Sequence, residues 1–456
     1  MSGALVTVAS FLLTVGLLVV IHELGHYAVA RLCGVKVLRF SVGFGRTVWV
    51  RRFGPDQTEW AIAAVPLGGF VKMLDSREGP VDAAESARAF DLQPVGQRIA
   101  IVLAGPVANF IAAFAVYWLL FVVGLPGVKP VVGDPPAGSP AAAAQLANGD
   151  TVRALGGEAV ETWNDLRWLL LKEAVRRGDV AVEVQGASGA VATRSLSLAS
   201  LEKDDLDRDF LIKLGLRPYT PSAPAVIGRV HAGGPGESMG LLEGDRVLAI
   251  DGRAIGSWGE FTSTVRAGAG RVLALEIERG GAKLALSGAP ESVGDGAARI
   301  GRLRVEPGAE VRREWERMTT TVRHGPLEAI PRAVHRVWDL SVFSLKMLGK
   351  MVMGEVSWKN LSGPITIADY AGQSAQLGWV SFASFLALVS VSLGVLNLLP
   401  VPLLDGGHLV YYFAEIVKGS PVSERAMELG QRVGLTLLVG LTLFAFYNDI
   451  NRLLTG

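Results

Sequence analysis

An uncharged apolar run near the N-terminus, residues 4–21, passes directly into the sequence His22-Glu23-Leu24-Gly25-His26. A run of this length is long enough to cross most of a lipid bilayer as a helix. Ionisable side chains within a membrane-spanning helix are energetically unfavourable and are retained mainly where they have a function. The chain is therefore predicted to begin with a membrane span that carries a buried polar site.

The two histidines of this segment are four residues apart, which places both imidazoles on one face of a helix. This spacing suits two nitrogen ligands of a single zinc ion. Glu23 lies between them and is placed to take a proton from a water molecule that zinc activates, as in metalloproteases with the H-E-x-x-H motif. We therefore expect His22 and His26 to bind Zn²⁺ and Glu23 to act as the catalytic base.

The composition is that of a membrane protein with a sizeable soluble portion. Of the 456 residues, 50% are hydrophobic and only 19% are charged. The formal net charge of +1, with no basic domain, argues against nucleic acid as a partner. Cys33 is the only cysteine of the sequence, so an internal disulfide framework is excluded.

Four apolar segments are each long enough to span a bilayer. They are predicted over residues 1–33, 98–125, 378–416 and 433–452. Lysine and arginine are frequent in the segments 34–97 and 417–432, whereas the N-terminal tail has none. The positive-inside rule then puts these two segments in the cytoplasm. Both termini and the large region between the second and third spans are expected on the periplasmic side.

The region between the second and third spans contains a repeat with an offset of 95 residues. The matching positions are Pro140 with Pro235, Gly149-Asp150 with Gly244-Asp245, and Trp163 with Trp258. In each copy a short apolar strand leads into a predicted hairpin turn, at Gly156-Gly157 or at Asp251-Gly252. These copies, 126–221 and 222–308, resemble PDZ domains, which bind extended peptides at a sheet edge. The alternative is a pair of structural spacers.

Residues 309–377 follow the second repeat. Apolar residues recur there at helical spacing beside many charged residues. This pattern predicts one or two amphipathic helices on the outer membrane surface.

A catalytic zinc site usually has three protein ligands and leaves one position for water. Asp405 lies in an otherwise apolar segment, where it is unfavourable unless it faces a partner such as zinc. His408 is the rival ligand, but a carboxylate with two histidines is a well-known catalytic set, which favours Asp405. Alternatively, Asp405 caps a helix and Asn397 satisfies backbone groups freed by the nearby Pro400.

Taken together, four features resemble the site-2 protease family of intramembrane metalloproteases over essentially the whole chain. These features are H-E-x-x-H in the first span, Ala104-Gly105-Pro106-Val107-Ala108-Asn109 in the second, tandem PDZ-like modules, and Asn397-x-x-Pro-x-Pro-x-Leu-Asp-Gly-Gly in the third. The resemblance implies that His22, His26 and Asp405 bind zinc, that Glu23 is the catalytic base and that Asn397 helps to hold the substrate. Gly43-Phe44-Gly45 matches a substrate-binding element in the family's membrane-associated β-loop, expected here over residues 34–97.

The resemblance also implies a fold and a function. The fold is a polytopic α-helical membrane protein with four transmembrane helices, a membrane-associated β-loop and two tandem PDZ-like α+β domains. The family's bacterial branch with this order of spans lies in the inner membrane. It cleaves transmembrane segments of single-span proteins, namely an anti-sigma factor of an envelope-stress pathway and remnant signal peptides.

Two readings from other functional classes remain open. A zinc-dependent transporter or metal sensor would need the ligands but not Glu23 between them. A membrane-anchored PDZ scaffold would have no reason to retain Asp405 in an apolar segment. For a protease, we expect the substrate to unwind and to pair as an added strand with an edge of the β-loop near Gly43. The alternative for this loop is an interfacial hairpin that anchors the first span.

Overall fold

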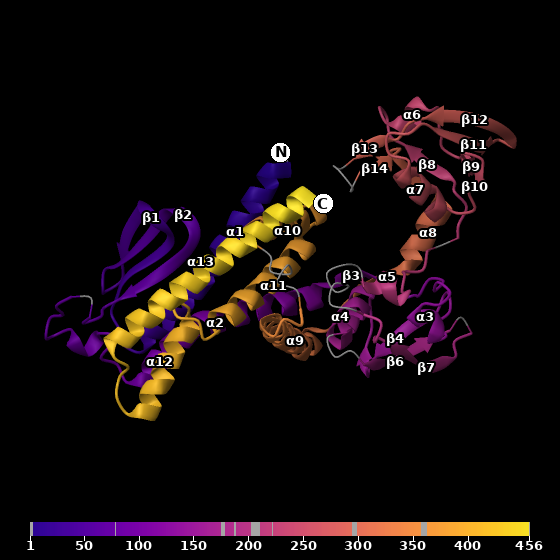
Figure 1. Ribbon diagram of the computed structural model, residues 1–456. Helices are drawn as coiled ribbons and strands as arrows, with labels where there is room; N and C mark the ends of the chain where they lie inside the picture. The colour runs from indigo at the N-terminus through magenta and orange to yellow at the C-terminus, as the bar shows by residue number, and fades with distance from the viewer. Residues whose placement is uncertain are drawn as a thin grey trace. The chain divides into compact units, whose positions relative to one another are not determined.

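The computed structural model (Figure 1) describes residues 3–77, 79–174, 178–186, 188–201, 210–220, 222–293, 299–356 and 363–455. One compact unit comprises residues 1–125 and 323–454, and a second is built from residues 126–322. Within the described residues, four helices of the first unit are long and apolar enough to cross a membrane: α1 (Gly3–Leu32), α2 (Val95–Val123), α11 (Trp379–Asn397) and most of α13 (Glu424–Thr455). This number agrees with the four predicted spans.

The helix at the centre of the first unit is α2, which contacts α1, α11, α9 (Pro326–Val352) and α12 (Asp405–Lys418). Glycines allow the closest approaches. A Cβ atom added to Gly25 of α1 would lie 2.2 Å from the carbonyl oxygen of Ala104. A Cβ added to Gly394 of α11 would lie 2.9 Å from the ring of Phe110. Such small-residue contacts are typical of helix interfaces in membranes, and here they bring α1 and α11 close to α2.

Strands β1 (Val37–Phe53) and β2 (Thr58–Met73) form a long antiparallel hairpin between α1 and α2. The hairpin folds back on itself, so residues 39–42 of β1 pair with two stretches of β2, 59–62 and 69–72. Gly43, with φ of 90°, lies at the bend of β1. As a result, the last residues of β2 form one edge of a small, strongly bent sheet.

The third predicted span, 378–416, is two helices joined by a turn. α11 ends at Asn397 and α12 begins at Asp405. The turn is tight because a Cβ on Gly406 would lie 2.2 Å from the carbonyl oxygen of Leu399. Leu403 has φ of 87°, a left-handed conformation that is strained for a side chain other than glycine. This turn, which also contains both prolines of the segment, fixes where Asp405 enters α12.

Two segments differ from the sequence-based expectation. A loop is expected over 417–432, but α13 begins at Glu424. Residues 424–432 are mostly good helix formers, and hydropathy detects only the apolar part of a helix. The connector 309–377 contains α8 (Ala309–Met318), strand β16 (Thr319–Val322), α9 and α10 (Pro364–Leu377). Within this connector, α10 packs against α1, where a Cβ on Gly372 would lie 2.3 Å from Thr7 Oγ1.

The second unit contains two modules that share a central order of elements, namely a short helix, two strands, a longer helix and two strands. Their sheets have the strand orders β5-β4-β6-β7 and β10-β9-β11-β12. Each module has its own hydrophobic core, one around Trp163 and the other around Trp258. Both predicted hairpin turns are confirmed, because Gly156-Gly157 and Asp251-Gly252 have positive φ at both positions, as a two-residue turn of this kind requires.

The bounds of the elements in the first module are α3 (Pro140–Ala143), β4 (Thr151–Leu155), β5 (Glu158–Ala159), α4 (Trp163–Ala174), β6 (Asp179–Gln185), β7 (Val191–Ser197) and α5 (Phe210–Leu214). In the second they are β8 (Ile227–Val230), α6 (Pro235–Ser238), β9 (Arg246–Ile250), β10 (Arg253–Ala254), α7 (Trp258–Ala267), β11 (Leu273–Arg279), β12 (Ala282–Gly288), β13 (Glu291–Val293), β14 (Ile300–Arg302) and β15 (Val305–Pro307). The 3-10 helix η1 (Ser86–Arg88) follows the hairpin, and β3 (Leu125–Val128) follows α2.

Candidate metal centre and active site

The side chains of His22, His26 and Asp405 meet at one point between α1 and the start of α12. The Nε2 atoms of the two imidazoles are 3.2 Å apart. Asp405 Oδ2 lies 3.2 Å from Nε2 of His22 and 3.5 Å from Nε2 of His26. Two histidines one helical turn apart and an aspartate from a distant part of the sequence therefore present one nitrogen or oxygen atom each to the same small volume.

The hydrogen bond made by Nδ1 of His26 determines which of its two ring nitrogens is free to bind a metal. Nδ1 of His26 lies 2.8 Å from the carbonyl oxygen of Ile101. A carbonyl oxygen can only accept a hydrogen bond, so Nδ1 carries the proton and donates it. In the neutral imidazole, Nε2 then presents a lone pair toward His22 and Asp405.

The arrangement fits a zinc ion. Donor atoms placed tetrahedrally around zinc at the usual bond lengths lie roughly 3.3 Å from one another. The three observed separations, 3.2, 3.2 and 3.5 Å, are close to that value. Asp405 Oδ2 is buried, and among the described residues it has no partner aligned for a hydrogen bond. Converging lone pairs and a buried carboxylate oxygen are unfavourable without a cation between them.

Glu23 lies on α1 between the two histidines and is buried, with 9% of its surface exposed. The edge of the β1–β2 hairpin approaches it closely, because a Cβ on Gly69 would lie 3.1 Å from Glu23 Cγ and 2.9 Å from the side chain of Val19. A larger residue at position 69 would push the strand away from α1. Gly69 therefore sets the distance between Glu23 and the sheet edge.

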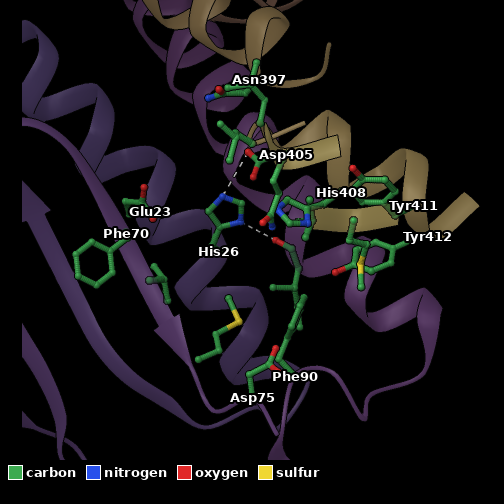
Figure 2. A pocket seen from close by; sticks show the side chains of 18 of the residues that line it. Glu23, His26, Phe70, Asp75, Phe90, Asn397, Asp405, His408, Tyr411 and Tyr412 are labelled. Carbon is green, nitrogen blue, oxygen red and sulfur yellow. Dashed lines mark hydrogen bonds and ion pairs between the residues drawn. The ribbon is translucent and has the colours of Figure 1, made fainter. Parts of the chain in front are cut away.

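These residues line a cavity of about 780 Å³ (Figure 2). In the view of Figure 2, Asn397 lies at one end of the cavity, and Asp75 and Phe90 lie at the other. Its polar lining residues are His22, Glu23, His26, Asp75, Arg77, Asn397, Asp405, His408, Tyr411, Tyr412, Glu428 and Gln431. A cavity with this lining can hold water beside an otherwise apolar helix bundle.

An ion pair marks the part of the cavity wall that follows β2. Arg77 Nη2 lies 2.5 Å from Asp75 Oδ2. Burial raises the pKa of the Asp75 carboxyl, but hydrogen bonds from the side chain and main chain of Arg77 outweigh that effect and hold the pKa below its ordinary value. Asp75 is therefore ionised at neutral pH, and its charge is paired with that of Arg77.

The remaining sequence-predicted residues are placed differently. His408 lines the cavity, but it is outside the cluster of converging donor atoms formed by the described residues. Asn397 also lines the cavity, at the end of α11. Gly43, Phe44 and Gly45 are not among the described lining residues. The strand segment that lines the cavity is the end of β2, which includes Gly69, Phe70 and Val71.

The helix that carries Asp405 is held by a partly buried ion pair that the sequence did not reveal. The guanidinium group of Arg98 on α2 donates two hydrogen bonds to Glu415 on α12, of 2.5 and 3.1 Å. The same guanidinium group lies 5.0 Å from the centre of the Tyr412 ring. Because Arg98 and Glu415 are 317 residues apart, neither the pairing nor its effect on Asp405 has a local sequence signal.

Comparison with known proteins also indicates a metalloprotease. Residues 10–441 match peptidase family M50. The regulator of sigma-E protease RseP of Escherichia coli is 43% identical, with 98% of each chain covered. The protein of that name from Salmonella typhimurium is 42% identical over 99% of this chain and 100% of its own length. A relative from Ralstonia nicotianae whose name describes a zinc metalloprotease is 43% identical over 98% of this chain and 99% of its own.

The match extends from the first span to the last and includes the whole of the donor cluster and Glu23. The sequence left three functional classes open: a protease, a metal transporter or sensor, and a scaffold. The family match identifies the protein as a protease, since the other two classes are not peptidases. The names of the relatives support zinc as the metal of the family. The chain belongs to peptidase family M50, the site-2 proteases, and is a membrane-embedded metalloprotease.

Proposed function

We propose that this protein is a zinc-dependent intramembrane endopeptidase in which His22, His26 and Asp405 hold the metal and Glu23 is the catalytic base. The observation that supports this most directly is the convergence of three donor atoms at separations of 3.2 to 3.5 Å beside a buried glutamate. Zinc bound in such a site supplies Lewis acidity, which acidifies water and polarises a carbonyl group.

The chain's own residues supply the proton transfers and the orientation. Glu23 accepts the proton of the attacking water and returns it to the amide nitrogen as the peptide bond breaks. Its buried position beside the strand edge keeps the carboxylate close to a peptide held on that edge. Asn397, at the far end of the cavity, donates hydrogen bonds to the substrate backbone.

The substrate is unwound and held as an added strand on the edge formed by the end of β2. A peptide bond inside a helix is covered by its own hydrogen bonds, and bare backbone groups in lipid are very unfavourable, so the enzyme must provide partners. Among the described residues, 69–73 pair with β1 on one side only, and Gly69, Phe70 and Val71 line the cavity. Gly43-Phe44-Gly45 act indirectly by shaping this edge, since Phe44 packs against Gly68.

The two modules of the second unit are PDZ-like and filter substrates by size, without taking part in the chemistry. Support comes from their shared strand order and from a cavity of about 690 Å³ in the second module, lined by residues of α7 and by 301–306. These modules and both termini lie on the periplasmic side of a bacterial inner membrane, a placement that the distribution of lysine and arginine supports.

The substrates are single-span membrane proteins. The names of the relatives connect them with sigma-E regulation, and the substrate that we infer for this protein is an anti-sigma factor. Remnant signal peptides have the same chemical character, a short apolar helix without a bulky ectodomain. The test is cleavage of a purified single-span substrate in detergent, with and without a zinc chelator. Cleavage that stops with the chelator and returns with added zinc supports the proposal, and cleavage that the chelator leaves unchanged contradicts it.

A further inference from the structure

Asn109 is a fully buried polar residue of α2 that lies beside the donor cluster. Its exposed fraction is 0%. Nδ2 of its carboxamide lies 3.3 Å from Nδ1 of His22, whereas its Oδ1 is buried and has no hydrogen-bond partner among the described residues. An unpaired carboxamide oxygen inside an apolar bundle is energetically unfavourable. Such a group calls for a physical explanation.

The proton of His22 provides one. For Nε2 of His22 to offer a lone pair to a metal, the proton must be on Nδ1, where it needs an acceptor. The nitrogen of the carboxamide only donates, but rotation of the amide group by half a turn exchanges its oxygen and nitrogen. With Oδ1 turned toward His22, the Nδ1 proton and the unpaired oxygen satisfy each other.

The same relationship is already present at His26. There, the acceptor of the Nδ1 proton is the carbonyl oxygen of Ile101, at 2.8 Å. Ile101, Gly105 and Asn109 follow one another at intervals of four residues and lie on one face of α2. Gly105 leaves room for the rings, since a Cβ there would lie 2.3 Å from His26 Nε2 and 2.8 Å from His22 Cε1. One face of α2 thus contacts both imidazoles on successive turns.

We propose that Asn109 is a positioning residue whose side-chain oxygen accepts the Nδ1 proton of His22 and thereby fixes the tautomer and ring orientation of that ligand. The proposal rests on the proposed function, in which His22 binds zinc. Partners of this kind, behind the ligands, typically change metal affinity 10- to 100-fold when they are removed. Asn109→Leu should therefore weaken zinc binding by about 10- to 100-fold. Asn109→Asp keeps an acceptor oxygen and should remain within a few fold of the wild type.

Ser390 offers a matched control. Its hydroxyl group donates a hydrogen bond of 2.8 Å to the main-chain oxygen of Asn109, and its side chain is as deeply buried. Ser390→Ala therefore removes a buried hydrogen bond at the same residue without touching the carboxamide. Its zinc affinity should equal that of the wild type.

The experiment is a zinc titration of the full-length, metal-free protein in detergent against a competing chelator of known affinity. Wild type, Asn109→Leu, Asn109→Asp, Ser390→Ala and His22→Ala are compared. Weak binding by Asn109→Leu, with binding retained by Asn109→Asp and Ser390→Ala, supports the proposal. Unchanged affinity in Asn109→Leu, or equal losses in Asn109→Asp or Ser390→Ala, overturns it. If His22→Ala itself keeps full zinc affinity, the proposed metal site is wrong, which separates that failure from a failure at Asn109.

Discussion

Gly105 of α2 lies directly against the imidazole of His26, so that a Cβ at this position would be only 2.3 Å from Nε2. Real Cβ atoms essentially never approach another heavy atom so closely. The contact is made by the ring nitrogen that faces Asp405, the one proposed to bind the metal. Glycine at position 105 of α2 is thus required for the positions of the two imidazoles on α1.

Gly105→Ala should therefore displace one or both imidazoles and weaken zinc binding at least 10-fold. Gly96→Ala is the matched control, because Gly96 is also in α2 and a Cβ there would meet no atom within 4 Å. Both variants are measured by zinc titration and by thermal unfolding in detergent. Normal zinc affinity in Gly105→Ala would show that the cluster does not depend on this contact.

The third ligand is decided by two substitutions on α12. Asp405→Ala removes the oxygen that lies 3.2 Å from His22 Nε2, and should lower both zinc content and cleavage rate by orders of magnitude. His408→Ala changes a residue that lines the cavity outside the donor cluster, and should retain zinc. Metal analysis of the purified variants checks this. Loss of zinc from the His408 variant alone would reverse the assignment.

Cleavage should depend on how easily the substrate helix unwinds. Helix-breaking glycine or proline residues in the substrate span should speed cleavage, and a span stiffened with leucine should slow it. On the enzyme, a proline at whichever of Phe70 and Val71 directs its N–H group to the free edge should slow cleavage without loss of zinc. Only one of these two adjacent residues can do so, because neighbouring residues of a strand direct their N–H groups to opposite edges. If a leucine-stiffened substrate is cleaved at the unchanged rate, the substrate does not need to unwind.

Removing the two modules of the second unit should change substrate selection and leave the chemistry intact. Each module has its own core, and neither core includes a residue of the donor cluster. A variant that lacks residues 131–307 should cleave a short single-span substrate at the normal rate. It should also accept substrates with intact ectodomains. The same substrates are assayed with the full-length protein. Continued rejection of the long substrates by the deletion variant would count against a size filter.

Much of the site could be predicted from the sequence because its information is local. The spacing of His22, Glu23 and His26 on one helix is set by helix geometry, and a carboxylate in an apolar segment identifies Asp405. The two-residue turns of the repeats were predictable for the same reason, since each depends on two adjacent residues.

Other features depend on contacts between distant residues. The strand edge at the cavity was expected near Gly43, but the structure has the end of β2 there, because the hairpin folds back and pairs 39–42 with two stretches of β2. The start of α13 was missed because its first turns are polar. Asn109 belongs to a motif that the sequence analysis identified, but its contact with His22 was not predictable, since it exists only when α1 and α2 are packed.

The most direct test of the proposed mechanism is the Glu23→Gln variant, measured for zinc content and for cleavage of a reconstituted single-span substrate in the same preparation. Glutamine has nearly the shape of glutamate but cannot accept the proton of the attacking water. We expect the variant to retain its zinc and to lose cleavage activity by several orders of magnitude. Normal cleavage by Glu23→Gln would contradict the assignment of Glu23 as the base.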